Sequence, residues 1–205
     1  VSTSAGNVKT IQYYYYHGAF YQNTMRNLEL VGDFAYTVDH EYGLAIFDLS
    51  DPVRPIMRGT YDYDREQRAI AVQGDYAYMG EYGWFGVVDI SDPDDPVRVG
   101  QVYVCDYYCY YHDIEVSGDY AFLTEGPYII TIDISDPQDP QFLTRYDCGG
   151  YFYDLEIHGN YLYAINDDIG LFTYEIESDG SLTHLNDDNY WNNYRGLTVT
   201  DDYIF

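Results

Sequence analysis

The sequence predicts an all-β protein, and within that class a β-propeller made of four-stranded antiparallel blades. The first observation is a recurring phrase in which a Gly-Asp pair, or a close variant, joins two strand-like runs. Its anchor positions lie 42, 44, 41 and 42 residues apart, at Gly32, Gly74, Gly118, Gly159 and Asp201. The second observation is that each repeat holds four short apolar runs and shows no helical periodicity. Four-stranded repeats of about 40 to 45 residues are typical of propeller blades.

The repeat that begins at Ala69 shows why each run is expected to be a strand. Its apolar residues are β-branched or aromatic, which favours strands. The four runs contain Ile70 and Val72, then Tyr76 and Tyr78, then Val87, Val88 and Ile90, and finally Val97, Val99 and Val102. A tight Gly74-Asp75 turn joins the first two runs, and residues 91–96 join the last two. Each repeat is therefore expected to form an antiparallel meander.

We expect residues 1–205 to form one propeller domain, because a single repeat type runs through the chain. About four full blades are visible, with predicted bounds of 28–68, 69–112, 113–153 and 154–196. Residues 1–27 would supply the outer strand of the closing blade, and residues 197–205 would begin a further blade. A chain that stops inside a blade leaves an open sheet edge, which proteins avoid. We therefore expect the chain to be incomplete at its C-terminus, or another subunit to complete the ring.

The wording of the repeat carries a family resemblance. The phrase I-A-V-Q-G-D-Y-A-Y from Ile70, followed by V-V-D-I-S-D-P from Val87, resembles the LVIVD repeat, a β-propeller repeat of bacterial and archaeal surface proteins. The match covers Leu28 to about Arg145. The fourth unit departs from it, because its third strand ends Y-E-I-E-S-D-G-S-L-T without S-D-P, an ending similar to lactonase-type propellers. The resemblance implies a propeller fold and a surface location, and it implies no particular activity.

The charge balance limits the partners. The chain has 35 acidic residues against 9 basic ones, a net charge of -26. Such a chain lacks the Lys/Arg patch that neutralises phosphates, so we expect no nucleic-acid partner. It has no apolar run of about 18 residues, so we expect no membrane insertion. An acidic, lysine-poor surface attracts cations and suits a salty or calcium-containing extracellular medium.

The three cysteines, Cys105, Cys109 and Cys148, lie between one repeat and the next. A secreted protein would form one disulfide among them and keep one thiol. Cys105, Cys109 and His112 resemble a metal set but lack a second pair at zinc-finger spacing. We expect no cofactor. Calcium is the one ion that the loop carboxylates suggest, with Asp39 and Glu41 or with Asp167 and Asp168 as ligands.

The S-D-P sequence recurs at residues 50–52, 91–93 and 135–137. Asp or Ser can close a turn through its own backbone, and Pro fixes φ within it. Because the sequence recurs in blade after blade, we interpret it as a turn device of the scaffold, together with the aspartates two residues before each Ser: Asp48, Asp89 and Asp133.

Polar residues flank each Gly-Asp turn at two fixed positions, six residues before and seven after the Gly. The resulting pairs are Arg26/Asp39, Arg68/Glu81, His112/Glu125 and Tyr153/Asn166. In a hairpin centred on Gly-Asp these positions would face each other. The pairs could simply lock each hairpin. They could also form a ligand-binding ring at the mouth of the central channel, because both positions lie on the face where each outer strand crosses to the next blade.

Aromatic residues concentrate in the segments between blades and near the N-terminus. Tyrosine combines an apolar plane with a polar tip, which suits contacts with proteins and sugars. The predicted interaction surface comprises Tyr13, Tyr14, Tyr15, Tyr16, Tyr107, Tyr108, Tyr110, Tyr111 and Trp191, with Tyr151, Tyr190 and Tyr194 as further candidates. Ordinary packing at the rim of the blades would also account for them.

The sequence contains no nucleophile elbow, zinc-protease helix, P-loop or dinucleotide fingerprint, so we assign no catalytic residue. We expect an extracellular or cell-surface, non-enzymatic interaction or assembly module. It would present an acidic, Tyr-rich face to another protein, a glycan or identical subunits, in a homo-oligomer or filament. Two alternatives remain: an extracellular lactonase-like hydrolase with a polar or metal site at the channel mouth, and a calcium-dependent adhesin.

Overall fold

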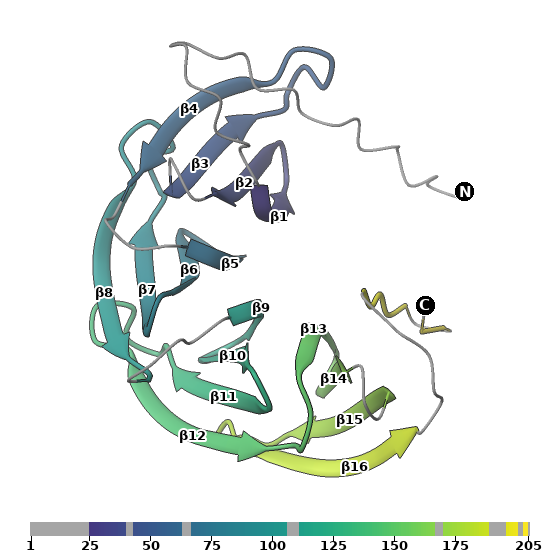
Figure 1. Cartoon of the computed structure of the whole chain (residues 1–205). Coiled ribbons are helices and arrows are strands. Elements are labelled where there is room, and N and C mark those ends of the chain that lie inside the picture. Colours follow the sequence, from purple (N-terminus) through teal and green to yellow (C-terminus); the bar gives the residue numbers. More distant parts are fainter. Residues whose placement is uncertain are drawn as a thin grey trace.

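The computed structural model describes residues 25–39, 43–62, 67–105, 111–166, 170–188, 196–200 and 203–204. Within these ranges the regular elements are all β-strands, and they form four separate four-stranded antiparallel sheets. The sheets stand around a common axis as the blades of an open arc (Figure 1). The structure thus confirms the predicted all-β propeller. No helix in the described ranges has the length and apolar character needed to span a membrane.

Each blade runs from an inner strand at the axis to an outer strand at the rim. Blade 1 comprises β1 (Met25–Val31), β2 (Phe34–Asp39), β3 (Gly43–Asp48) and β4 (Ile56–Tyr61). Blade 2 comprises β5 (Gln67–Gln73), β6 (Tyr76–Glu81), β7 (Trp84–Asp89) and β8 (Val97–Tyr103). Blade 3 comprises β9 (Tyr111–Ser117), β10 (Tyr120–Glu125), β11 (Tyr128–Asp133) and β12 (Gln141–Asp147). Blade 4 comprises β13 (Phe152–His158), β14 (Tyr161–Asn166), β15 (Gly170–Ile176) and β16 (Leu182–Asp188).

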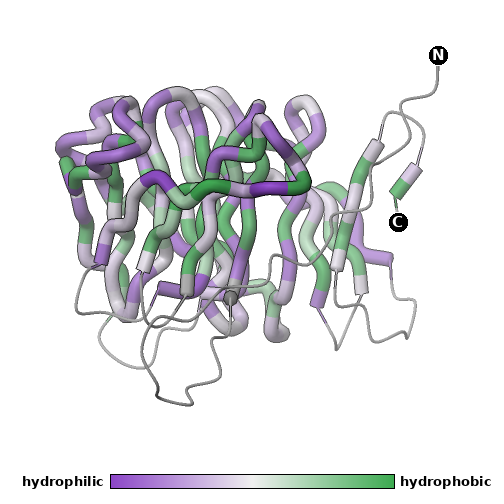
Figure 2. Tube along the Cα trace, turned by 90° about the horizontal axis from the view of Figure 1, so that it is seen from above, coloured by the Kyte–Doolittle hydropathy of each residue, from purple (hydrophilic) through white to green (hydrophobic). Residues whose placement is uncertain are grey.

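The core lies between the blades, because alternate residues of the middle strands point to opposite faces of each sheet. Blades 1 and 2 enclose one apolar cluster, blades 2 and 3 a second, and blades 3 and 4 a third. Their largest members include Ile46, Met79, Phe85, Leu123, Phe122 and Phe152. In side view the strands stand upright, with hydrophobic segments inside them and hydrophilic turns at their ends (Figure 2).

The S-D-P sequences close the turns between third and fourth strands. Asp48, Asp89 and Asp133 each accept a hydrogen bond, 2.9 Å long, from the N–H of the Ser two residues later. The Asp within each S-D-P sequence likewise accepts a hydrogen bond, 3.0 to 3.1 Å long, from the N–H of the residue two positions later. These contacts confirm that the motif is a turn device of the scaffold.

Two glycines on outer strands let neighbouring blades approach closely. A Cβ on Gly59 of β4 would overlap the carbonyl oxygen of Pro93 in the S-D-P turn of blade 2. A Cβ on Gly100 of β8 would likewise overlap the carbonyl oxygen of Pro137 in the S-D-P turn of blade 3. The equivalent position of β12 is Thr144, and blade 4 has no S-D-P turn to receive. The glycine and the following turn are therefore a matched pair.

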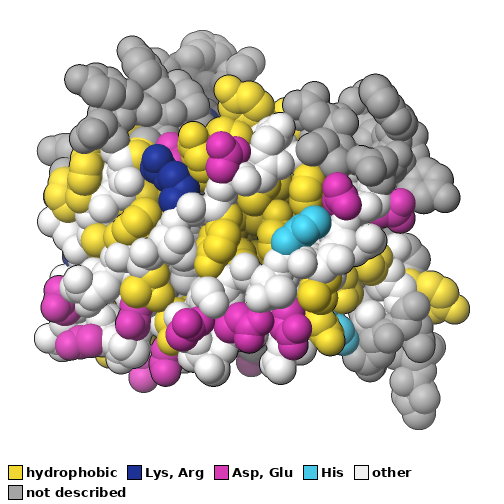
Figure 3. All heavy atoms as spheres, turned by 90° about the horizontal axis from the view of Figure 1, so that it is seen from below, with side chains coloured by type: hydrophobic (Ala, Val, Ile, Leu, Met, Phe, Trp, Pro, Cys, Tyr) yellow, Lys and Arg dark blue, Asp and Glu magenta, His cyan; other side chains and the backbone are white. Residues whose placement is uncertain are grey.

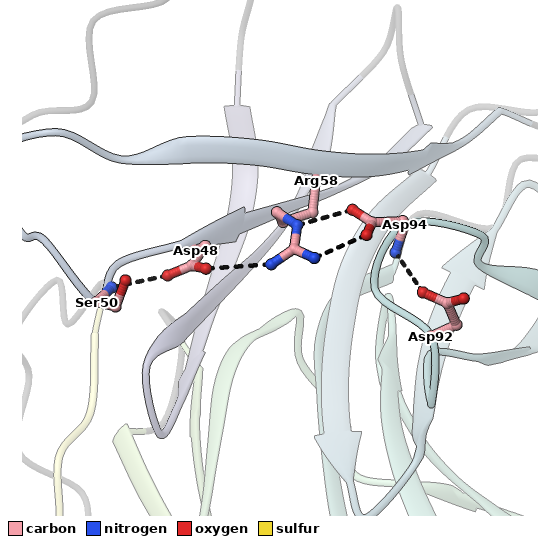
Figure 4. Close-up of polar contacts among 5 residues, drawn as sticks. All are labelled: Asp48, Ser50, Arg58, Asp92 and Asp94. Carbon is pink, nitrogen blue, oxygen red and sulfur yellow. Dashed lines mark hydrogen bonds and ion pairs between the residues drawn. The ribbon is translucent and has the colours of Figure 1, made fainter.

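Arg58 links the turn between β3 and β4 of its own blade to the S-D-P turn of blade 2 (Figure 4). Its guanidinium donates two hydrogen bonds of 2.7 Å to the carboxylate of Asp94 in blade 2 and one of 3.2 Å to Asp48 in its own blade. Asp94 in turn donates its N–H to Asp92. This exposed cluster spans the junction between blade 1 and blade 2.

Several predictions at the two ends of the chain lie outside the described residues. The outer strand was expected within residues 1–27, of which residues 1–24 are not described; they include Tyr13, Tyr14, Tyr15 and Tyr16. The candidates Tyr190, Trp191 and Tyr194 are not described either. Beyond them, Val199 and Ile204 form an antiparallel bridge.

Candidate functional site

A β-bulge interrupts the first hairpin of every blade near the axis. In blade 2, Gln67 pairs with Glu81 and Ala69 with Gly80, so Arg68 is the extra residue. In blade 3, Tyr111 pairs with Glu125, and the N–H groups of His112 and Asp113 both donate to the hydroxyl of Thr124, at 3.1 and 3.0 Å. A bulge turns the following side chains away from the regular alternation.

The bulges overturn the predicted cross-strand pairs. The acid of each pair faces the residue before the predicted base, which is Met25 for Asp39, Gln67 for Glu81 and Tyr111 for Glu125. Asn166 likewise faces Phe152 rather than Tyr153. The ring of His112 instead lies beside that of Tyr153, 5.4 Å between centroids. The side chains of Arg26 and Asp39 lie outside the described part of the chain, so their ligand-binding role stays a prediction.

The acids find their partners on the outer strands. Glu81 is fully buried and forms an ion pair with Arg98 of β8, which also donates to the hydroxyl of Tyr61 at 3.0 Å. Glu125 pairs with Arg145 of β12 at 2.7 Å, and that guanidinium lies over the ring of Tyr128. Burial raises the pKa of Glu125, and Arg145 opposes the rise. These arginines hold the acids inside the blades.

Gln67 shares the buried position beside Glu81. Its side chain is fully buried, and among the described residues neither its amide oxygen nor its amide nitrogen has a hydrogen-bond partner. It packs against Gly43, whose φ of 66° and missing Cβ make room for it. This position has no predicted role, and the sequence offered no signal for it beyond a polar residue next to Arg68.

A second polar cluster lies where the inner strands meet, and we call its members, Glu29, Asp113, Glu115, Asp154 and Glu156, the axial carboxylates. Asp113 of β9 is 8% exposed and uses both of its oxygens. Oδ1 accepts a hydrogen bond from Asn27 of β1 at 3.3 Å, and Oδ2 accepts one from the N–H of Leu155 in β13 at 2.8 Å. Asp154 repeats this contact one blade later, accepting the N–H of Leu197 at 2.5 Å. Asp113 therefore joins blade 3 to the inner strand of blade 4, and Asp154 joins blade 4 to the segment that begins at residue 196.

Burial, and then the adjacent carboxylate of Asp154, hold the pKa of Asp113 well above its ordinary value. Two residues further along the inner strands lie Glu29, Glu115 and Glu156. Burial and then the charge of Glu156 raise the pKa of Glu115 to about 8.

The pKa values of the other two glutamates are also raised. Burial comes first in both, followed by the charge of Glu156 on Glu29 and of Asp154 on Glu156. The sequence did carry a signal for these residues, because an acid stands in the middle of L-E-L, I-E-V and L-E-I on three inner strands. Our sequence reasoning missed them, because an acid between two apolar residues also fits an ordinary half-exposed strand.

We call the face that carries the turns between second and third strands the crossing face. Aromatic rings cover glycine turns on it. Tyr103 lies over Gly83 and forms an edge contact with Trp84, 5.1 Å between centroids, and Tyr151 lies over Gly126 one blade further on. Tyr82, Tyr103 and Tyr151 are 43%, 45% and 59% exposed. These three residues and Trp84 form what we call the aromatic patch.

The residues predicted to form the interaction surface differ in their exposure. Tyr111 is buried, at 1% exposure, so its assignment to an exposed surface was wrong. Tyr111 pairs with Glu125 across the hairpin, and its side chain packs in the apolar cluster between blades 2 and 3. Tyr107, Tyr108 and Tyr110 lie outside the described ranges. Tyr151 is exposed on the crossing face. Tyr82, Trp84 and Tyr103 were not singled out from the sequence, because they belong to strands and turns rather than to the segments between blades.

The cysteines match the expectation of one disulfide and one remaining thiol. Cys105 is disulfide-bonded, and Cys148 is free. Burial raises the pKa of the Cys148 thiol, which accepts a hydrogen bond from the hydroxyl of Tyr174 at 3.1 Å. Within the described ranges no three His, Cys, Asp or Glu side chains are arranged to hold a metal ion. The proposed calcium ligands Glu41, Asp167 and Asp168 lie outside these ranges, as does the side chain of Asp39.

The opposite face, which we call the turn face, carries the Gly-Asp and S-D-P turns and is acidic. In the view of the rim in Figure 3, carboxylates line one edge, while hydrophobic side chains spread over the middle. The exposed acids of the described turns are Asp33, Asp51, Asp75, Asp92, Asp94, Asp95, Asp119, Asp136, Asp139 and Asp179. In the part of the chain that the structure describes, the acids of these turns therefore lie on the face opposite the aromatic patch.

Comparison with known proteins supports the fold. The family model of the LVIVD repeat matches residues 24–63, 64–104 and 110–148. No curated protein sequence matches the chain. Among solved structures, a protein from Lactobacillus plantarum superposes with a TM-score of 0.74 at 12% identity, over 85% of this chain and 57% of that one.

Two further structures are similar. A functionally unknown protein from Desulfotomaculum acetoxidans gives a TM-score of 0.67 at 14% identity, over 82% of this chain and 56% of that one. A periplasmic gluconolactonase from Pseudomonas aeruginosa gives 0.62 at 12% identity, over 77% and 54%. At these identities the similarity shows the fold alone. The chain spans little more than half the length of each of these three structures.

Proposed function

We propose that this chain, which belongs to the LVIVD repeat family, is a non-enzymatic interaction module, secreted or displayed at the cell surface. The observation that carries the proposal is the aromatic patch, in which three tyrosines are each more than two fifths exposed on one face of two adjacent blade junctions. Large exposed aromatic groups on a rigid scaffold are typical of binding surfaces. The acids once expected to form a ligand-binding ring there are held inside the blades by Arg98 and Arg145.

Among the partners that the sequence left open, an uncharged glycan fits best. A net charge of -26 repels a second copy of the chain and any other acidic protein. A neutral sugar suffers no such repulsion. Its apolar ring face stacks on tyrosine and tryptophan, and its hydroxyl groups donate to carboxylates of the kind that border this face, such as Asp62 and Asp147.

A glycan array tests this proposal with the full chain as the probe. We expect retention on neutral glycans and little on sialylated or sulfated ones, whether or not a calcium chelator is present. Loss of binding on chelation would favour the calcium-dependent adhesin instead. A sample that binds no glycan but sediments as a species larger than one chain would replace the glycan by a second copy as the partner.

A lactonase-like hydrolase is the second candidate function. It is favoured by the neighbouring carboxyl groups of Asp113 and Asp154, because two adjacent carboxyl groups, one of them buried with a raised pKa, could supply a general acid and a general base. The similar fold of a gluconolactonase adds the substrate class to test. If the wild-type chain hydrolyses gluconolactone and Asp154→Asn does not, this candidate would be favoured over the interaction module.

A further inference from the structure

The axial carboxylates bring together three strands that are far apart in sequence. Asn27 belongs to β1, Asp113 to β9 and Leu155 to β13, and the carboxylate of Asp113 accepts a hydrogen bond from each of the other two. In blade 2 the position equivalent to Asp113 is Ala69. Because its side chain is short, the side chain of Asn27 in blade 1 can reach Asp113 in blade 3 directly. One side chain therefore connects three blades at the axis of the propeller.

We propose that the axial carboxylates make this joint responsive to acid, so that protonation tightens the contact between blade 4 and blades 1 and 3, and ionisation loosens it. The joint is distinct from the aromatic patch, and it does not depend on what the crossing face binds.

The surroundings of Asp113 explain why ionisation would loosen the joint. Asp154 lies beside it on β13, and Glu115 lies two residues away on β9. Glu156 of β13 and Glu29 of β1 act in turn on Glu115. The inner strand of blade 2 contributes Ala69 and Ala71 at the positions that match Asp113 and Glu115, so these two positions carry no charge. His158 partly offsets the rise in the pKa of Glu156. Neighbouring carboxylates repel one another once they are ionised.

The direction of the pH dependence follows from burial and this repulsion. In the unfolded chain Glu115 has its ordinary pKa of 4.5, and in the folded protein the pKa is raised to about 8. A carboxyl group whose pKa is higher in the folded state contributes most to stability below pH 4.5, where it is protonated in both states. That contribution falls as the pH rises toward 8, because folding then opposes ionisation. The joint should therefore weaken between pH 5 and pH 8.

Thermal unfolding of the full chain at pH 5, 6, 7 and 8 tests the proposal. The wild type should lose roughly 5 °C or more of its midpoint over this range. In Glu115→Gln, which keeps the shape and removes the charge, at least half of that loss should disappear. The matched control is Glu175→Gln on β15, which removes the same charge away from the axis and should leave the loss unchanged.

Hydrogen exchange gives a second readout that does not depend on global unfolding. The N–H of Leu155, which donates to Asp113, should show a protection factor that falls at least tenfold from pH 5 to pH 8 in the wild type and changes less in Glu115→Gln. Equal pH dependence in the wild type and both variants would overturn the proposal. So would an equal reduction in both variants, because general charge repulsion would then be the cause.

Discussion

Gly100 of β8 lies so close to Pro137 of the next blade that a Cβ on the glycine would overlap the proline carbonyl oxygen. Because the obstacle is backbone, it cannot rotate away as a side chain could. The Gly59/Pro93 contact repeats the arrangement one blade earlier. The spacing between blades is therefore set by an absent side chain on one sheet and a proline turn on the next.

Replacing Gly100 by alanine should accordingly destabilise the protein by about 1–3 kcal/mol, the usual range for overpacking. The measurement is urea unfolding followed by circular dichroism. Thr144→Ala is the control, because Thr144 occupies the equivalent position of β12, where blade 4 presents no S-D-P turn. A Gly100→Ala variant as stable as the control would show that the blades can separate without cost.

The buried ion pair in blade 2 should be more sensitive than its counterpart in blade 3. Arg98→Met leaves the fully buried Glu81 without its partner, which should cost about 3–5 kcal/mol. Arg145→Met is the matched control and should cost about 1 kcal/mol or less, because its pair with Glu125 is more exposed. Adding Glu81→Gln to Arg98→Met should restore part of the loss. An equal cost for both arginine variants would contradict the burial argument.

Acid should destabilise the protein through the S-D-P turns. The backbone N–H and side chain of Ser50 lower the pKa of Asp48, and the Ser91 side chain and N–H lower that of Asp89. The stability that such groups add is present above their ordinary pKa of 3.8 and is lost as the pH falls through the folded values. Asp89→Asn keeps the capping oxygen but does not titrate, so its midpoint should fall less than that of the wild type between pH 4 and pH 2.

The fold was predictable because its signals are repeated and local. A period near 42 residues, Gly-Asp turns and S-D-P turns define four strands per repeat, and the structure places them in that order. The pairing at the start of each blade was not predictable by counting from the turn. Arg68 and His112 each lie in a bulge, and one extra residue shifts the register so that Gln67 and Tyr111 take the positions expected for the bases.

The candidate site was less accessible from the sequence than the fold. Glu115 and Asp113 become unusual only when the inner strands meet at the axis, a contact between residues some 40 to 86 positions apart. Tyr103 and Trp84 become a surface only when two strands bring their rings together. Composition indicated that tyrosines would be exposed between blades, and Tyr151 is, but it could not separate Tyr151 from the buried Tyr111.

The most direct test of the central claim is the retention of aromatic-patch variants on the neutral-glycan array. Tyr103→Ala combined with Tyr151→Ala should reduce retention at least tenfold, because a stacked aromatic ring contributes about 0.5–1.5 kcal/mol beyond the area it buries. Tyr161→Ala removes a tyrosine of similar exposure from the turn face and should bind like the wild type. Unchanged retention in the double variant, or an equal loss in Tyr161→Ala, would contradict the account.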